Sequence, residues 1–193
     1  MNPVSHFLVS WSFAEPVHLD LRDKAIVTWL GVAPDLDGMG GVVDLLARSF
    51  GYTSPDLYGQ FHHEVFHGLF GAILLPAVAI IFARKRLNTF LLGFIVMHLH
   101  MLCDIVGSRG INREDIWPIN YLAPFSQKFA FEWNGQWEIN AWPNVVITIA
   151  LIIFMFVRTI SHGHSVVSLF KMRAHEAFVL TVQTRWKNFR GHV

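Results

Sequence analysis

Histidine and aspartate side chains gather at the ends of apolar segments in this chain, in numbers that suit a metal site. Imidazole and carboxylate groups together favour zinc, manganese or iron over calcium or magnesium. The candidate ligands are His6, Asp35, Asp37, His62, His63, His67, His100 and Asp104. They exceed the three or four protein ligands that one zinc ion takes. The sequence therefore predicts a divalent-metal site, with zinc as the favoured ion and with enough ligands for two ions.

A site of this composition predicts a reaction class. Two metal ions about 3.5–4 Å apart are typical of enzymes that hydrolyse phosphoesters with a metal-activated water. Glu64, beside the histidine cluster, is the candidate general base, although an aspartate not fully engaged as a ligand could serve instead. Arg109 is the candidate group for neutralising a phosphate, with Arg113 as its alternative.

The spacing of the ligands predicts that distant segments meet. His63 and His67 are four residues apart, as are His100 and Asp104, so each pair would share one face of a helix. Lys85, in the basic turn between the two clusters, lies 18 residues after His67 and 19 residues before Asp104. In an antiparallel helical hairpin the two clusters would therefore lie level.

Composition and hydropathy indicate a membrane protein. Hydrophobic residues make up 53% of the chain and charged residues 15%, against about 25% in typical globular proteins. A helix needs about 20 residues to cross a bilayer core of about 30 Å. Residues 87–106 are long enough alone. Residues 69–83 reach this length only with the preceding histidine turn, and residues 141–157 are marginal.

Two further apolar segments near the N-terminus, residues 4–14 and 24–33, are too short to span and would be partly inserted. His6 would open the first, and the loop predicted at residues 34–38 would follow the second. The candidate ligands of both segments therefore fall at the same end of a helical hairpin.

The predicted fold is all-α. It is an integral membrane helical bundle with about three spanning helices, two short partly inserted N-terminal helices and a C-terminal amphipathic helix within residues 165–190. Residues 1–160 would form a membrane-embedded, hydrolase-like domain, and residues 161–193 a cytoplasmic tail.

Charge predicts the orientation. The basic turn Arg84-Lys85-Arg86 and the cations after Arg158 favour the cytoplasm, which would place the metal site at the non-cytoplasmic face of a multi-pass protein. A net charge of +1 gives no basis for a nucleic-acid partner. The single cysteine excludes an internal disulfide.

The order and spacing of these residues resemble the membrane-bound metal-dependent hydrolases, the YdjM-like family of bacterial and archaeal inner-membrane proteins. The resemblance covers about residues 1–124. It rests on Ser5-His6-Phe7, Pro34-Asp35-Leu36-Asp37, His62 with His67, His100-Met101-Leu102-Cys103-Asp104 and Trp117-Pro118. The family's ligand pattern is distantly similar to zinc-dependent phospholipase C. The resemblance therefore implies hydrolysis of a phosphoester or phospholipid at the inner membrane.

The chain departs from the family at its second histidine motif. The family pattern is His-Arg-Gly-x-Thr-His-Ser, whereas residues 62–68 read His-His-Glu-Val-Phe-His-Gly, without the arginine, threonine and serine. His62 fits the family by its spacing, whereas His63 is favoured by helix geometry, so both remain candidates. The missing arginine removes one expected phosphate contact.

Three functions are compatible with these features. The favoured one is a membrane-bound hydrolase that cleaves a phosphoester of a lipid or another amphiphile. The alternative is a non-catalytic membrane protein with a structural metal site, acting in an envelope or stress-response complex. The third, an ion or proton translocator, is disfavoured because residues 69–83 and 87–97 contain no ionisable side chain along their length.

Overall fold

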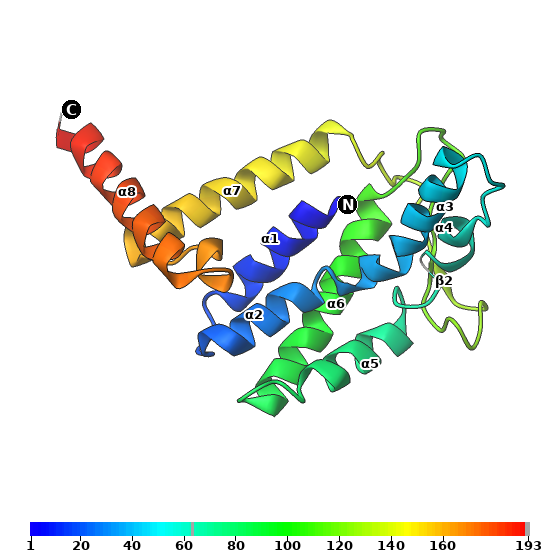
Figure 1. Ribbon diagram of the computed structural model, residues 1–193, viewed down its shortest axis with the longest axis horizontal. Coiled ribbons are helices and arrows are strands. Elements are labelled where there is room, and N and C mark those ends of the chain that lie inside the picture. The colour runs from blue at the N-terminus through cyan, green and yellow to red at the C-terminus, as the bar shows by residue number, and fades with distance from the viewer. Residues whose placement is uncertain (63, 192–193) are drawn as a thin grey trace.

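The structure is a computed structural model that describes residues 1–62 and 64–191, and it is predominantly helical, as the sequence predicts (Figure 1). Its α-helices are α1 (Pro3–Ala14), α2 (Leu21–Leu30), α3 (Gly40–Ser49), α4 (Leu57–Phe61), α5 (Leu69–Ala79), α6 (Arg86–Gly107), α7 (Trp142–His162) and α8 (Met172–Gly191). The remaining elements are the 3₁₀ helices η1 (Ala33–Met39) and η2 (Val166–Leu169) and the antiparallel pair β1 (Ile119–Asn120) and β2 (Ala130–Phe131).

Within the described ranges, two helices are long and apolar enough to cross a membrane. They are α6, with 22 residues and a mean hydropathy of 1.9, and α7, with 21 residues and a mean hydropathy of 2.1. Ile149 and Ile153 of α7 are 51% and 57% exposed, so this helix presents apolar side chains outward. That surface suits contact with lipid.

The third predicted span is not confirmed. Its helix, α5, has 11 residues and so rises about 16 Å, roughly half of a bilayer core. The helix begins only at Leu69 because Gly68 is extended, with φ −151° and ψ −174°. At its other end the chain leaves the helix after Ala79 and reaches the basic turn through residues 80–83.

The helices pack around α6, which runs through the middle of the molecule (Figure 1). Helices α1, α2 and α5 contact it, and α7 lies against α1. Buried Val27 and Leu30 of α2 pack with Val96 of α6. A Cβ atom on Gly93 would lie 2.7 Å from a methyl group of Leu30, so glycine permits this close approach.

Buried polar side chains fix both ends of α6. The carboxylate of Asp23, fully buried in α2, accepts hydrogen bonds of 2.8 Å from the backbone N–H groups of Arg84 and Lys85. At the opposite end, Asn144 of α7 donates to the carbonyl of Gly107 over 2.9 Å. Helix α7 therefore starts where α6 ends, and the two candidate spans run antiparallel.

A network around Glu15 joins three helices at the basic end of the bundle. Glu15 directly follows α1, is only 3% exposed, and accepts hydrogen bonds from Arg158 at 2.9 Å and from His164. Lys24 of α2 donates to its carbonyl oxygen. Burial alone would raise the pKa of the Glu15 carboxyl, but the Arg158 and His164 hydrogen bonds outweigh burial and lower it below 4.5.

This network predicts a pH-dependent contribution to stability. Because the pKa of Glu15 is lowered on folding, its stabilisation is present above pH 4.5, the pKa of the unfolded group, and is lost as the pH falls through the folded pKa. We expect Glu15→Gln to reduce the free energy of unfolding by about 2 kcal/mol near neutral pH. Denaturant titrations of both proteins should converge in acid. A constant difference across the pH range would contradict the prediction.

Candidate metal centre

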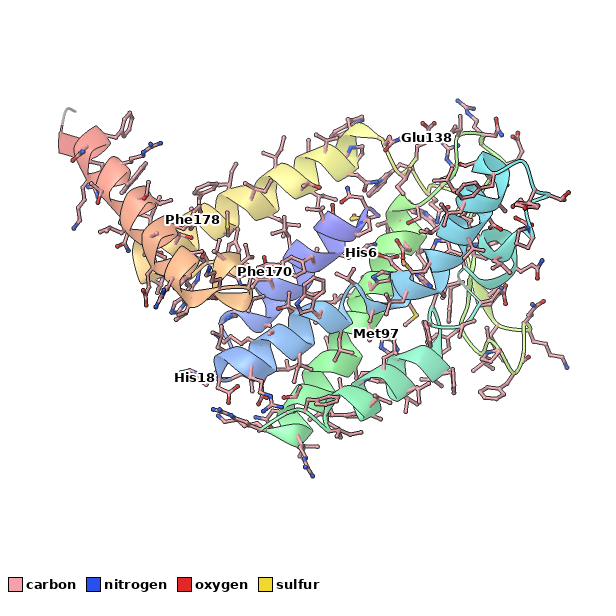
Figure 2. The ribbon with its side chains drawn as sticks, viewed as in Figure 1. His6, His18, Met97, Glu138, Phe170 and Phe178 are labelled. Atoms are coloured by element: carbon pink, nitrogen blue, oxygen red, sulfur yellow. The ribbon has the colours of Figure 1, made fainter. Side chains whose placement is uncertain are left out.

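Four parts of the chain deliver the candidate ligands to one place. His6 comes from the start of α1, Asp35 from η1, His67 from the turn before α5, and His100 and Asp104 from the last turns of α6. The ring of His6 stacks on that of His100 with centroids 3.7 Å apart, which joins α1 to α6. Figure 2 labels His6 on α1, beside α6. The convergence predicted from the spacing is present, including the level placement of His67 and Asp104.

Four ligand atoms from these residues lie close together. His67 Nε2 lies 3.1 Å from His100 Nε2 and 3.6 Å from Asp104 Oδ2, and His100 Nε2 lies 2.9 Å from Asp104 Oδ2. Asp35 Oδ1 lies 3.9 Å from His67 Nε2 and 3.6 Å from His100 Nε2. Ligands of a tetrahedral zinc ion are about 3.4 Å apart, as follows from zinc–nitrogen bonds of about 2.0–2.1 Å. The five separations bracket this value.

Hydrogen bonds orient both imidazoles toward this point. His67 donates from Nδ1 to Asp37 Oδ2 over 2.9 Å, and His100 donates from Nδ1 to the carbonyl of Gly31 over 2.8 Å. A neutral imidazole has one N–H group, so each Nε2 then carries a lone pair. Metal-bound histidines are fixed by carboxylates or carbonyls in this manner.

Asp104 leaves acceptor capacity at the same point. Its Oδ2 atom is buried and, among the described residues, accepts no hydrogen bond. The other oxygen of Asp104 is fully engaged, by His6 at 3.1 Å, by Ser108 at 2.5 Å and by the Met1 amine. Buried electron-rich atoms that face one another need a cation between them. The donor set, its burial and its spacing therefore fit a zinc-type ion.

Asp37 has a different place from the other aspartates. Its Oδ1 accepts from His62 Nδ1 over 2.8 Å, and its Oδ2 accepts from His67 Nδ1 and from the backbone N–H of Phe66. Burial alone would raise the pKa of Asp37, but the hydrogen bonds from His62 and His67 hold it well below its usual value. Asp37 is thus an anion that positions two imidazoles. With His62 and His67 it also forms a group close enough to hold an ion.

Two local expectations are wrong. His67 does not lie on a helix with the preceding histidine, because α4 ends at Phe61 and residues 64–68 are turns and bends. The hydrogen bond from Phe66 to Asp37 stabilises this non-helical backbone. The loop predicted at residues 34–38 is instead part of the 3₁₀ helix η1. His63, one of the two alternative ligands, lies outside the described residues.

The two predicted catalytic residues lie in loops. Glu64 accepts hydrogen bonds from Asn120 at 2.8 Å and from Gln127 at 3.4 Å. Arg109 pairs with Glu138 at 2.9 Å and donates to backbone carbonyls of neighbouring loops. Glu64 and Arg109 therefore contact residues other than the converging ligands. Their roles as general base and as phosphate contact stay predictions.

A cavity of about 320 Å³ lies beside His62. His62 is 11% exposed, and its ring centroid is 5.4 Å from that of His67. Asp35, with a side chain 22% exposed, is more open to solvent than the other three converging ligands. The described residues around the cavity are Tyr58, Gly59, His62, Glu64, Ile116, Trp117, Pro118 and Asn120.

A family model described as YdjM inner membrane protein matches residues 1–183, nearly the whole chain. The chain belongs to the YdjM inner membrane protein family. No curated protein and no solved structure matches it.

Membership of the YdjM family identifies an inner membrane protein, in agreement with the two candidate spanning helices. Asp104 lies 18 residues beyond Arg86 on α6, a rise of about 27 Å. The centre and the basic turn of this YdjM-family chain are therefore at opposite ends of a helix long enough to cross a bilayer.

Sequence reasoning did not identify Gly31 as part of the centre. Its carbonyl orients His100, and its lack of a side chain lets α2 approach α1. A Cβ atom on Gly31 would lie 1.6 Å from Ser10 Oγ and 2.5 Å from Ser10 Cβ. A glycine after an apolar helix is a common signal for the end of the helix, and nothing local marks its carbonyl as a histidine partner.

Metal content tests the four-atom centre. Loss of a residue that is hydrogen-bonded to a metal ligand costs about 10–100-fold in metal affinity. Loss of the ligand itself should cost more, so His67→Ala and His100→Ala should each reduce bound zinc to background. His98→Ala is the matched control, because His98 lies on α6 but contacts the Phe94 carbonyl and Tyr121. Elemental analysis of detergent-purified protein measures the molar ratio of zinc to protein. Full zinc content in both ligand variants would exclude this centre.

A side-chain exchange tests the Gly31 contact. We expect Gly31→Ala to weaken zinc binding about tenfold, because the new methyl group displaces the carbonyl that orients His100. The double variant Ser10→Gly/Gly31→Ala removes the clash and should recover the affinity. Competition with a zinc chelator measures it, with Ser10→Gly as control. An unchanged affinity in Gly31→Ala would show that this carbonyl does not position the ligand.

Proposed function

We propose that this chain is a membrane-bound, metal-dependent hydrolase that cleaves a phosphoester of a lipid or another amphiphile. The observation that carries the proposal is the convergence of His67, His100, Asp35 and Asp104, with both imidazoles fixed through Nδ1. The centre would lie at the non-cytoplasmic face, since it is remote from the basic turn.

The four converging atoms would hold a zinc ion, with manganese or iron as alternatives. When bound, such an ion supplies an activated water and neutralises charge on a phosphoryl oxygen. The other oxygen of Asp104, Oδ1, forms a hydrogen bond with His6. Helix α1 therefore positions Asp104 without supplying one of the four converging atoms. His6, His100 and Asp104 also lie close enough together to hold an ion. This group is an alternative to the four-atom set, because His100 Nδ1 donates to Gly31 and leaves only Nε2 for a metal.

His62 is the residue of this chain best placed to move a proton. Its Nδ1 donates to Asp37, so Nε2 carries the lone pair, and the ring borders the cavity next to His67. In the hydrolysis, water adds to phosphorus and the ester P–O bond breaks. His62 Nε2 would accept the proton of the water and return it to the leaving alkoxide.

Access distinguishes this proposal from a purely structural metal site. A structural site is closed by protein ligands, whereas a catalytic site keeps a position for water or substrate. His67 and His100 are fully buried, whereas the side chain of Asp35 is 22% exposed, so the centre is more open to solvent at Asp35. This asymmetry supports the catalytic function over the structural one.

Turnover assays test the proposal. The zinc-loaded full chain should hydrolyse bis(p-nitrophenyl) phosphate or phospholipid in mixed micelles. We expect His62→Gln to lower kcat by about 10²–10⁴-fold while zinc content stays unchanged. His162→Gln is the control, because His162 is an exposed residue at the end of α7 that is remote from the candidate centre.

A zinc-loaded protein that hydrolyses none of these esters would overturn the proposal and favour a structural metal site. A His62→Gln variant with the kcat of the wild type would overturn the role of His62 in proton transfer.

A further inference from the structure

The cavity beside the candidate centre contains a group of residues that hydrolysis itself does not require. Tyr58, Trp117 and Glu64 form its walls together with His62, and they come from α4, the loop before β1 and the turn before α5. Their chemistry indicates what kind of substrate group would occupy this space.

Among the described residues, three aromatic rings lie on one side of the cavity. The ring centroids of Tyr58 and Trp117 lie 6.1 Å apart, and those of His62 lie 4.4 Å from Tyr58 and 5.3 Å from Trp117. The planes of Tyr58 and Trp117 are inclined by 55°. Aromatic faces attract a cation within about 6 Å of the ring centroid. Inclined rings of this kind are suited to form one wall of a cation site.

Glu64 supplies a fixed negative charge to the same cavity. Asn120 of β1 donates to one carboxylate oxygen and Gln127 to the other, so the group is held toward β1. A carboxylate has about four lone-pair positions, so two such hydrogen bonds leave room for an ammonium donor.

The electrostatic environment favours a positive ligand. None of the described residues that line the cavity is lysine or arginine. The one acidic side chain among these residues is Glu64. This composition favours a cation at the cavity wall.

We propose that this cavity binds the ammonium group of the substrate. The substrate would then be a phosphoester with an aminoalkyl headgroup, its phosphate at the metal centre and its ammonium between Tyr58, Trp117 and Glu64. The assignment rests on the proposed function, which it narrows to one class of headgroup. It also gives Glu64 a binding role in place of proton transfer.

Binding measurements on the zinc-loaded full chain test this assignment. Phosphoethanolamine and glycerol 1-phosphate share a phosphate monoester and differ in the ammonium group. We expect isothermal titration calorimetry to show at least about tenfold tighter binding of phosphoethanolamine, the magnitude of a desolvated cation–π contact with an added charge. Glu64→Gln should abolish this preference, and Glu138→Gln, altered at the outer Arg109 pair, should keep it.

A second pair of variants separates recognition from folding. Trp117→Phe keeps an aromatic face and should retain most of the preference, whereas Trp117→Leu should lose it at an equal melting temperature. Equal affinity of wild type for both ligands, or a preference that survives Glu64→Gln, would overturn the assignment.

The source of the ammonium group is decided by a parallel titration. Nanodiscs of phosphatidylethanolamine that compete with phosphoethanolamine, where nanodiscs of phosphatidylglycerol do not, would identify a lipid headgroup. Competition by neither would identify a soluble ester. Failure is also distinguishable from failure of the hydrolase: turnover of both lipids alike would reject only the ammonium site, and selective binding without turnover would reject only the hydrolysis.

Discussion

The separation of 3.1 Å between His67 Nε2 and His100 Nε2 is the constraint on which the centre depends. Each ring donates its single proton elsewhere, to Asp37 and to the Gly31 carbonyl, so two lone pairs face each other beside the carboxylate of Asp104. Without a cation this arrangement is repulsive, and with one it is a preformed ligand set. The fold holds these atoms in place through contacts that are independent of an ion.

Those contacts are buried polar interactions at both ends of α6. Asp23 binds the backbone at its start, and Asn144 binds the carbonyl of Gly107 at its end. The Glu15 network secures α1 and α2 against α7 at the basic end. Helix α1 contacts α6 directly, and η1 contacts α2, which also packs on α6. The centre is therefore positioned by three helical elements, α1, η1 and α6, and by the turn before α5.

That turn connects metal binding to the cavity. Asp37 holds His67, which faces the centre, and His62, which faces the cavity. One carboxylate therefore sets the geometry of a candidate ligand and of the candidate proton carrier together. This coupling explains why the turn before α5 is not helical, and why α5 has only 11 residues.

The sequence by itself determined the helical class, the two long apolar helices and the meeting of distant ligands. Four-residue spacing put His100 and Asp104 on one helix face, and the distances from Lys85 put His67 level with Asp104. Only the tertiary structure decided that Asp37 orients two histidines and that the Gly31 carbonyl fixes His100. The reason is physical: helix periodicity is local and can be counted along the chain. A hydrogen bond between residues about 30 to 70 positions apart depends on how whole elements pack.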